Sequence, residues 1–223
     1  MVQASESVSA ADATFDELRV LLAPQVARSA MFDGWSHAAV DAAALGAGVD
    51  PAVARLAFPD AMSMISGWVA AVDARMEAAF GAGQLDGVPV REKIRRLVLF
   101  RLETVRGLEE ALSRALAIQA MPQNVPAALR LGWSSADIMW RLAGDTATDY
   151  NHYTKRAILA GIYAATLAVY IDDTSDGKAD SLAFLDRRID GVMRFEKAKG
   201  QLLAKREGFD VMRFLGRLRY PAT

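Results

Sequence analysis

The sequence contains no cysteine, and this absence excludes disulfide bridges, thiolate metal sites and a cysteine nucleophile. Histidine is scarce, because His37 and His152 are the only two and neither lies beside an evident serine–acid pair. The sequence has no G-x-S-x-G nucleophile elbow, and it has neither G-x-G-x-x-G nor G-K-[ST] for phosphate binding. We therefore expect a protein that is not an enzyme and has no catalytic residues and no cofactor.

Long apolar runs are lacking as well. The longest uncharged run, residues 157–171, is shorter than the ~18–20 residues that a helix needs to cross a bilayer. Residues 1–17 hold no lysine or arginine and no apolar core, so they fit neither a transit peptide nor a signal peptide. The sequence thus indicates either a protein of a bacterial-type cytoplasm or a chain from which a targeting segment was removed.

Alternating apolar and polar positions, the mark of strands, are also lacking, whereas apolar residues recur at helical spacing almost everywhere. We predict an all-α fold of about nine or ten helices. Three parts are expected: an N-terminal helix with a helix-turn-helix (1–60), a helical body (61–200) and a basic tail (201–223). The tail follows from charge, since residues 187–219 hold ten lysines and arginines against four acids.

Residues 35–60 have the layout of a helix-turn-helix. Ser36 and Asp50 are capping residues, Pro51 suits a first helical position, and Pro59 ends the unit. The arrangement resembles the N-terminal module of TetR-type regulators. Between residues 33 and 60, however, four acids face a single base, Arg55, and DNA affinity depends on basic residues that neutralise phosphates. We expect no nucleic-acid partner, and a TetR-type ligand-responsive regulator remains the alternative function.

The body is expected to contain a helix over 61–80, one or two helices over 90–119 and a break at 121–126. Ser134 or Ser135 is predicted to cap a helix that ends at Leu142. A further helix begins at Thr148 or Asp149 and continues through residue 171, and another covers 182–200. The helix over residues 157–168 carries small residues at i,i+3 and i,i+4 spacing, which indicates close approach of a neighbouring helix or a dimer interface.

One group of side chains suggests metal binding. Asp145, Asp149 and His152 recur at i, i+4 and i+7, and such ligands suit non-haem iron. Gly144 interrupts the helix, however, and no second histidine is near, since His37 lies in the helix-turn-helix. We therefore expect no metal, and we expect both aspartates to cap helix ends.

The tail from residue 209 is amphipathic. Its bulky apolar side chains fall within an arc of about 160° on a helical wheel, with two arginines opposite. Such a helix can lie on an anionic membrane surface, or it can pack on the protein's own body or on a partner subunit. The residues themselves leave both possibilities open.

From about residue 32 to the end, the chain resembles the ubiquinone-biosynthesis accessory family with a TetR-like fold, the lipid-binding partner of the demethoxyubiquinone hydroxylase. The resemblance rests on RALAIQAMPQNVPAALRL (114–131), DIMWRLAGDTATDYNHYTKRAILAGIY (137–163) and the acidic pair that follows. It implies a non-enzymatic homodimer that holds an isoprenoid or phospholipid and presents quinone precursors to the hydroxylase. Its location would be peripheral, on the inner membrane of a bacterium or on the matrix side of a mitochondrial membrane.

The resemblance also implies three sets of residues. Family members commonly carry a large aromatic residue, often Trp, where this chain has His152, so this position is a departure that weakens the expected contact. The expected hydroxylase-facing residues are Leu102, Asp137, Met139, Asp149, His152 and Tyr153. The expected lipid-lining residues are Leu97, Phe100, Ile118, Met121, Trp133, Ile138, Trp140 and Tyr163. The expected membrane-contacting residues are Phe209, Met212, Arg213, Phe214, Leu215, Arg217 and Leu218.

Overall fold

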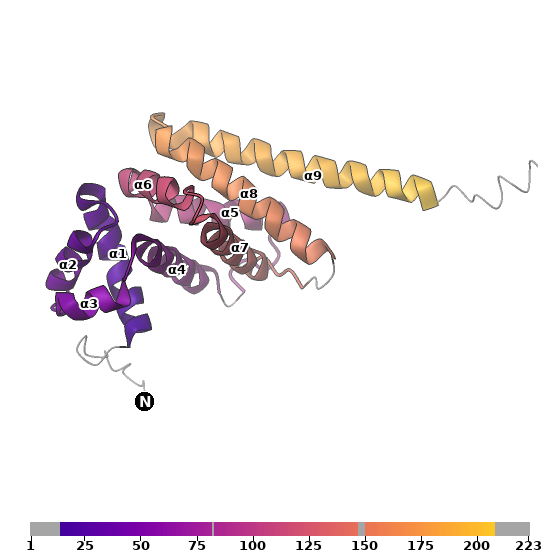
Figure 1. Ribbon diagram of the computed structural model, residues 1–223. Coiled ribbons are helices and arrows are strands. Elements are labelled where there is room, and N and C mark those ends of the chain that lie inside the picture. The colour runs from indigo at the N-terminus through magenta and orange to yellow at the C-terminus, as the bar shows by residue number, and fades with distance from the viewer. Residues whose placement is uncertain (1–13, 82, 147–149, 208–223) are drawn as a thin grey trace, which may run out of the picture.

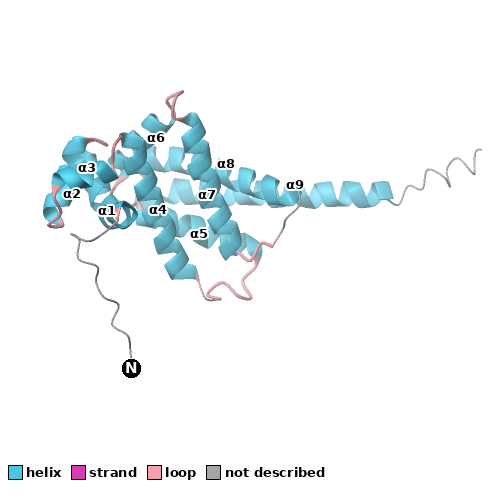
Figure 2. Cartoon of the chain, turned by 60° about the horizontal axis from the view of Figure 1, so that its bottom comes forward, coloured by secondary structure: helices cyan, strands magenta, loops and turns pink. Residues whose placement is uncertain are grey.

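The computed structural model describes residues 14–81, 83–146 and 150–207 and consists of helices joined by short loops (Figures 1 and 2). Within these ranges there are nine α-helices, one 3-10 turn and no strand. The prediction of an all-α fold is confirmed. The seven residues expected to contact a membrane, all between 209 and 218, and Asp149 of the expected partner patch lie outside the described residues.

Three helices form one end of the molecule (Figure 1). They are α1 (Phe15–Asp33), α2 (His37–Gly46) and α3 (Pro51–Ala57). Thr14 and Glu17 form a capping box at the start of α1, and the Asp50 carboxylate accepts the amide of Ala52 at the start of α3. Alanines fill the buried faces of α2 and α3, which lets these short helices lie close to α1. The helix-turn-helix layout is therefore present as predicted.

The other helices form the body, with α7 and α8 side by side and α9 lying along α8 (Figures 1 and 2). The turn between α5 and α6 passes through Gly107, whose φ of 77° is a left-handed conformation that suits glycine. The body helices are α4 (Ala61–Phe80), α5 (Val90–Thr104), α6 (Glu109–Gln119), α7 (Val125–Leu142), α8 (Tyr150–Asp172) and α9 (Ala179–Glu207), with the 3-10 turn Asp176–Lys178 before α9.

Two helix boundaries differ from the prediction. The expected cap at Ser134 or Ser135 is wrong, because α7 already begins at Val125 and continues through both serines. The Ser135 hydroxyl is buried and donates to Asp73, so it satisfies a partner in the core instead of a helix end. The second difference concerns α9, which is longer than expected and runs without a break through the expected domain boundary at residue 200.

Helix α9 is joined to the body by its first half. Leu185 and Ile189 are buried in the core, and Asp186 accepts a hydrogen bond from Arg95 at 2.7 Å. The end of α9 extends past the other helices (Figure 1). No helix in the described part of the chain has the length and hydropathy that a membrane span requires.

Candidate functional site

A cavity of about 620 Å³ lies among α4, α6, α7 and α8. This volume is within the range of small-molecule sites. Its walls are mainly apolar, with Ile65 and Trp68 from α4 and Leu112 and Leu116 from α6. Leu129 of α7 also lines the cavity and is 69% exposed, so the cavity opens to the surface beside α7.

Small residues of α8 leave the space in which the cavity forms. The α8 wall consists of Tyr163, Leu167 and four small residues, Ala157, Ala160, Gly161 and Ala164. A Cβ added at Gly161 would meet no atom within 4 Å. On one side Ala160 lies close to Gly132 of α7, where an added Cβ would be 4.0 Å away, so a neighbouring helix does approach. The other small residues border an open volume, and the alternative of a dimer interface there stays a prediction.

Two of the eight expected lipid-lining residues, Trp133 and Tyr163, line this cavity. Trp140 instead lines a second apolar cavity, of about 400 Å³, between α5, α7, α8 and α9. Phe100 packs edge-to-face on Phe80 and borders a third hollow. The remaining four do not line the 620 Å³ cavity: Leu97 is in the core, Ile118 and Ile138 are partly buried against it, and Met121 is exposed. Helical periodicity identifies inward faces, but it does not separate a cavity wall from packed core.

The polar side chains of the cavity wall include Gln119, Arg101 and Ser135, and the last two form a buried cluster with Asp73 that joins α4, α5 and α7. Arg101 is 2% exposed; its Nη1 donates to Asp73, and its Nη2 donates to the Ser135 hydroxyl at 3.1 Å. The Ser135 hydroxyl in turn donates to the second oxygen of Asp73 at 3.0 Å. The guanidinium also lies over the ring of Tyr163, 4.8 Å from its centroid. Burial alone would lower the pKa of Arg101, but Tyr163 and Asp73 outweigh it and raise the pKa, so the side chain stays protonated.

Beside the cavity, three aromatic side chains gather where α7 and α8 meet. The Trp133 ring lies 6.4 Å from that of His152 and 6.0 Å from that of Tyr153, and the His152 and Tyr153 rings are 5.1 Å apart. Tyr153 is 62% exposed, which is unusual for so large a side chain. Because Trp133 also lines the cavity, this aromatic patch (Trp133, His152 and Tyr153) and the cavity share a wall.

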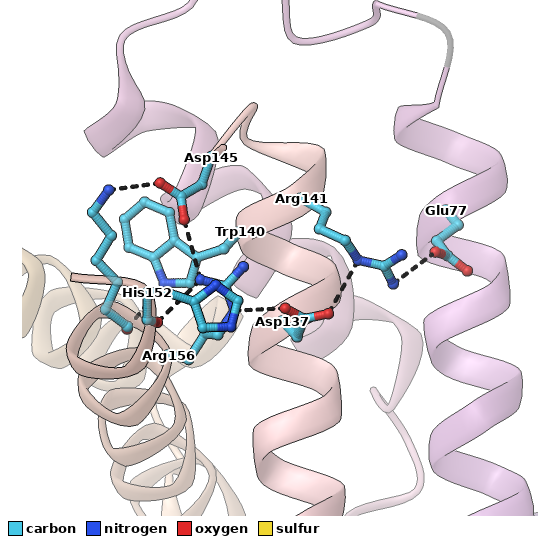
Figure 3. Close-up of polar contacts among 8 residues, drawn as sticks. Glu77, Asp137, Trp140, Arg141, Asp145, His152 and Arg156 are labelled. Carbon is cyan, nitrogen blue, oxygen red and sulfur yellow. Dashed lines mark hydrogen bonds and ion pairs between the residues drawn. The ribbon is translucent and has the colours of Figure 1, made fainter. Parts of the chain in front are cut away.

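A network of charged side chains fixes the start of α8 against α7 (Figure 3). The buried Arg156 donates to Asp137 at 2.5 Å, to Asp145 at 3.1 Å and to the carbonyl of His152 at 3.0 Å. Lys155 donates to Asp145 at 2.6 Å. Burial would raise the pKa of Asp145, but the hydrogen bonds from Lys155 and Arg156 outweigh it, so the pKa is lowered below its ordinary value. The network continues through Arg141 to Glu77 of α4, and Trp140 donates to the carbonyl of Lys155.

These contacts change the interpretation of the expected capping and metal residues. Asp145 pairs with two cations of α8, Lys155 and Arg156, and its expected role as a helix cap stays a prediction. No group of three or more histidines, cysteines, aspartates and glutamates that could hold a metal ion occurs in the described ranges.

Two residues of the expected partner patch are not at the surface. Leu102 is 3% exposed and Met139 is 0% exposed, because both face the core from α5 and α7. Their expected contact with a partner stays a prediction, and in this structure neither side chain is accessible to one. Asp137 and His152 are partly exposed and Tyr153 is exposed, so these three remain available. Trp133 was assigned to lipid alone, although the rings that surround it place it in the patch too.

Comparisons with known proteins agree with one family. The COQ9 family model matches residues 125–196. The rat protein "Ubiquinone biosynthesis protein COQ9, mitochondrial" (Rattus norvegicus) is 35% identical over 167 residues, which cover 72% of this chain and 54% of the relative. The human protein of the same name (Homo sapiens) is 32% identical and covers 72% of this chain and 52% of the relative. The chain thus spans about half the length of the curated relatives it matches.

A solved structure is also similar in fold. The TetR transcriptional regulator from Nitrosomonas europaea ATCC 19718 superposes with a TM-score of 0.61 at 17% identity, covering 78% of this chain and 96% of that chain. This likeness confirms the predicted TetR-like fold. The matched family segment contains the aromatic patch and most of the charged network. Over residues 125–196 the chain thus matches the COQ9 family model, and over 167 residues it is similar to curated relatives that are named ubiquinone biosynthesis proteins.

Proposed function

We propose that this chain is a non-enzymatic lipid-binding accessory protein of ubiquinone biosynthesis, which holds an isoprenoid or quinone-precursor lipid and presents it to the demethoxyubiquinone hydroxylase. The observation that carries the proposal is the apolar cavity of about 620 Å³, which opens at Leu129. Burial of apolar surface is favourable by roughly 25 cal/mol per Å², so an isoprenoid chain gains free energy on entering such a space.

The polar groups of the cavity support a carrier more than a catalyst. Arg101 stays protonated and is paired with Asp73, and the Ser135 hydroxyl is bonded to the same carboxylate. Neither arrangement provides a general base beside a nucleophile, which acyl or group transfer needs. The cavity residues would bind and orient a lipid and exclude water from it.

The aromatic patch supports a docking surface for the hydroxylase. Exposed aromatic residues dominate the binding energy of many protein interfaces, and Tyr153 is such a residue. The charged network holds Tyr153 and His152 in position, because Arg156 ties their helix to Asp137 and Asp145. A partner bound on Tyr153 would reach Trp133, a wall of the cavity, and this shared wall would couple docking to release of the lipid.

The remaining parts of the proposal concern the membrane and the assembly. A basic amphipathic tail over 209–223 would bring the open side of the cavity to an anionic membrane surface, on the inner membrane of a bacterium or on the matrix side of a mitochondrial membrane. Homodimerisation is part of the same proposal. DNA binding is not, since Arg55, the one base between residues 33 and 60, is paired with Asp41. A gel shift at low salt would test the alternative function of a transcription regulator.

The experiment is complementation in the source organism. Loss of the gene should raise the ratio of demethoxyubiquinone to ubiquinone, because the hydroxylase would lack presented substrate. The wild-type gene should restore the ratio. A gene whose product has a narrowed cavity, Gly161→Leu, should restore the ratio less well than the wild-type gene. Ala168→Leu, on the same helix but outside the cavity lining, should restore it fully. An unchanged ratio on gene loss would contradict the proposed function.

A further inference from the structure

The second apolar cavity, of about 400 Å³, lies on the opposite face of α8 from the proposed lipid cavity. Its walls are mainly apolar, with Ile94 of α5, Leu159 of α8 and Ile189 of α9. Val90 and Met193 also line this cavity and are 48% and 47% exposed, so they mark its mouth. Apolar side chains left open to water beside a hollow are typical of a contact site.

The charged side chains of this second cavity are already paired. Arg91 donates to Asp190 at 2.7 Å, and Lys155 donates to Asp145 at 2.6 Å. On the described lining, each charge therefore has an opposite charge beside it, and no single charge attracts an ionic ligand. The surface suits an apolar occupant.

The length of the chain beyond α9 identifies an occupant. Gly208 directly follows Glu207, the last residue of α9, and a glycine in this position commonly lets a chain turn out of a helix. At 1.5 Å per residue, α9 covers about 21 Å from Met193 to Glu207, and a helix over residues 209–223 has the same length of about 21 Å. A helix that turned back at Gly208 would therefore end level with Met193, at the mouth of the second cavity. The end of α9 extends past the other described helices, which leaves its sides open to such a segment (Figure 1).

The chemistry of residues 209–223 matches this surface. Their bulky apolar side chains fall within an arc of about 160° on a helical wheel, and Arg213 and Arg217 lie opposite. When the arc faces the protein, both arginines stay in water, so docking buries neither charge. Tyr220 is the last aromatic residue of the chain, and this register brings it to the cavity mouth.

We propose that residues 209–223 fold back along α9 as an amphipathic helix and cover the mouth of the second cavity, with Tyr220 against Val90 and Met193. The apolar arc that docks is the one that would enter a membrane surface, so docking and membrane binding exclude each other. This exclusion rests on the membrane contact in the proposed function, whereas the docking itself does not. The segment thereby shields its apolar arc from water when no membrane is present.

The test measures the distance between the end of the segment and the cavity mouth. The chain contains no cysteine, so a donor and an acceptor dye can be attached to the full chain at Arg194→Cys, an exposed position beside Met193, and at Ala222→Cys. Packed helices lie about 10 Å apart, so docking brings the two labelled residues to about this distance. A segment that continued α9 in a straight line would separate them by about 42 Å.

Energy transfer between the dyes should be high in the absence of vesicles. It should stay high when the doubly labelled chain is mixed with excess unlabelled chain, because the contact is within one molecule. Vesicles of equal parts phosphatidylcholine and phosphatidylglycerol should lower the transfer, most clearly at low salt.

Two variants test where the segment docks. Met193→Ser removes an apolar side chain from the cavity mouth, and Tyr220→Ser removes the side chain proposed to meet it, so each should lower the transfer. Val20→Ser is the matched control, because Val20 is a 54% exposed apolar residue of α1 outside this cavity, and it should leave the transfer unchanged. If Met193→Ser does not fold, Tyr220→Ser decides the same point from the segment itself.

The outcomes are distinct. High transfer that falls in the two variants and not in Val20→Ser supports the docking. Low transfer without vesicles overturns it, and so does transfer that disappears as unlabelled chain is added, since the segment would then dock on a second copy. Equal transfer in the wild type and both variants rejects the cavity mouth as the docking site. Transfer that vesicles do not change, although the chain floats with them, overturns the exclusion. The lipid content of the purified protein tests the proposed function separately from all of these results.

Discussion

Replacement of Gly161 by leucine should narrow the cavity without harming the fold. Gly161 lies on α8, is exposed, lines the cavity, and has no atom within 4 Å of an added Cβ. The leucine side chain would occupy space equivalent to about four methylenes of a ligand. At ~0.8 kcal/mol per buried methylene, the loss is about 3 kcal/mol, or roughly a hundredfold in dissociation constant.

The same substitution should leave the protein at least as stable as before. Glycine in a helix interior is less favourable than alanine by about 1 kcal/mol, and leucine is nearly as good as alanine. Displacement of a fluorescent apolar dye measures affinity, and urea denaturation measures the free energy of unfolding. Ala168→Leu, an exposed position of the same helix outside the cavity lining, is the control and should bind dye as the wild type does. Unchanged affinity in a folded Gly161→Leu protein would refute the assignment of this cavity as the ligand site.

Four further predictions address the patch, the network and the tail. Tyr153→Ala should weaken binding of the hydroxylase by about 2 kcal/mol, which is roughly a thirtyfold rise in the dissociation constant measured by surface plasmon resonance. Phe32→Ala, which removes an exposed aromatic side chain of α1, should leave that dissociation constant unchanged. Arg156→Met should lower the free energy of unfolding, measured by urea titration, by about 3 kcal/mol, because it leaves Asp137 and Asp145 with one cation each. The control Arg96→Met, which breaks a surface pair, should cost at most about 0.5 kcal/mol in the same titration. The pKa of Asp145 is lowered from 3.8 in the folded state, so its ionised form stabilises the fold above pH 3.8, and this contribution is lost as the pH falls through the folded pKa. The difference in Tm between wild type and Asp145→Asn should therefore shrink in acid. A constant difference would contradict this. Removal of residues 208–223 should reduce flotation with anionic liposomes, most clearly at low salt, and equal flotation would count against a membrane role for the tail.

Much of the fold could be predicted from local chemistry. Asp50 caps α3 as its side chain suggests, whereas Ser36 stands at the N-cap of α2 without a side-chain capping hydrogen bond. Gly107 permits the turn that divides residues 90–119 into two helices. The start of α7 could not be read in this way. Ser135 looks like a cap, but its hydroxyl serves a buried ion pair with residues 34 and 62 positions earlier in the chain, and such long-range partners leave no local pattern.

The site was harder to predict because it depends on which inward residues touch one another. Met139 and Leu102 both face the core, so a patch transferred from a family resemblance contained two buried members. The small residues of α8 are a signal for the cavity, but the same residues also predict close approach of a helix or a dimer interface. Whether small residues receive a neighbouring helix or leave a space depends on the opposite wall, here α4, α6 and α7.

The most direct test of the central claim is the lipid content of the purified protein. Organic extraction followed by mass spectrometry, with protein quantified in the same sample, gives the amount of each lipid per chain. We predict that the wild type carries an isoprenoid or phospholipid, that Gly161→Leu carries far less, and that Ala168→Leu matches the wild type. An extract of the wild type that contains no lipid, or equal lipid content in all three proteins, would contradict the account.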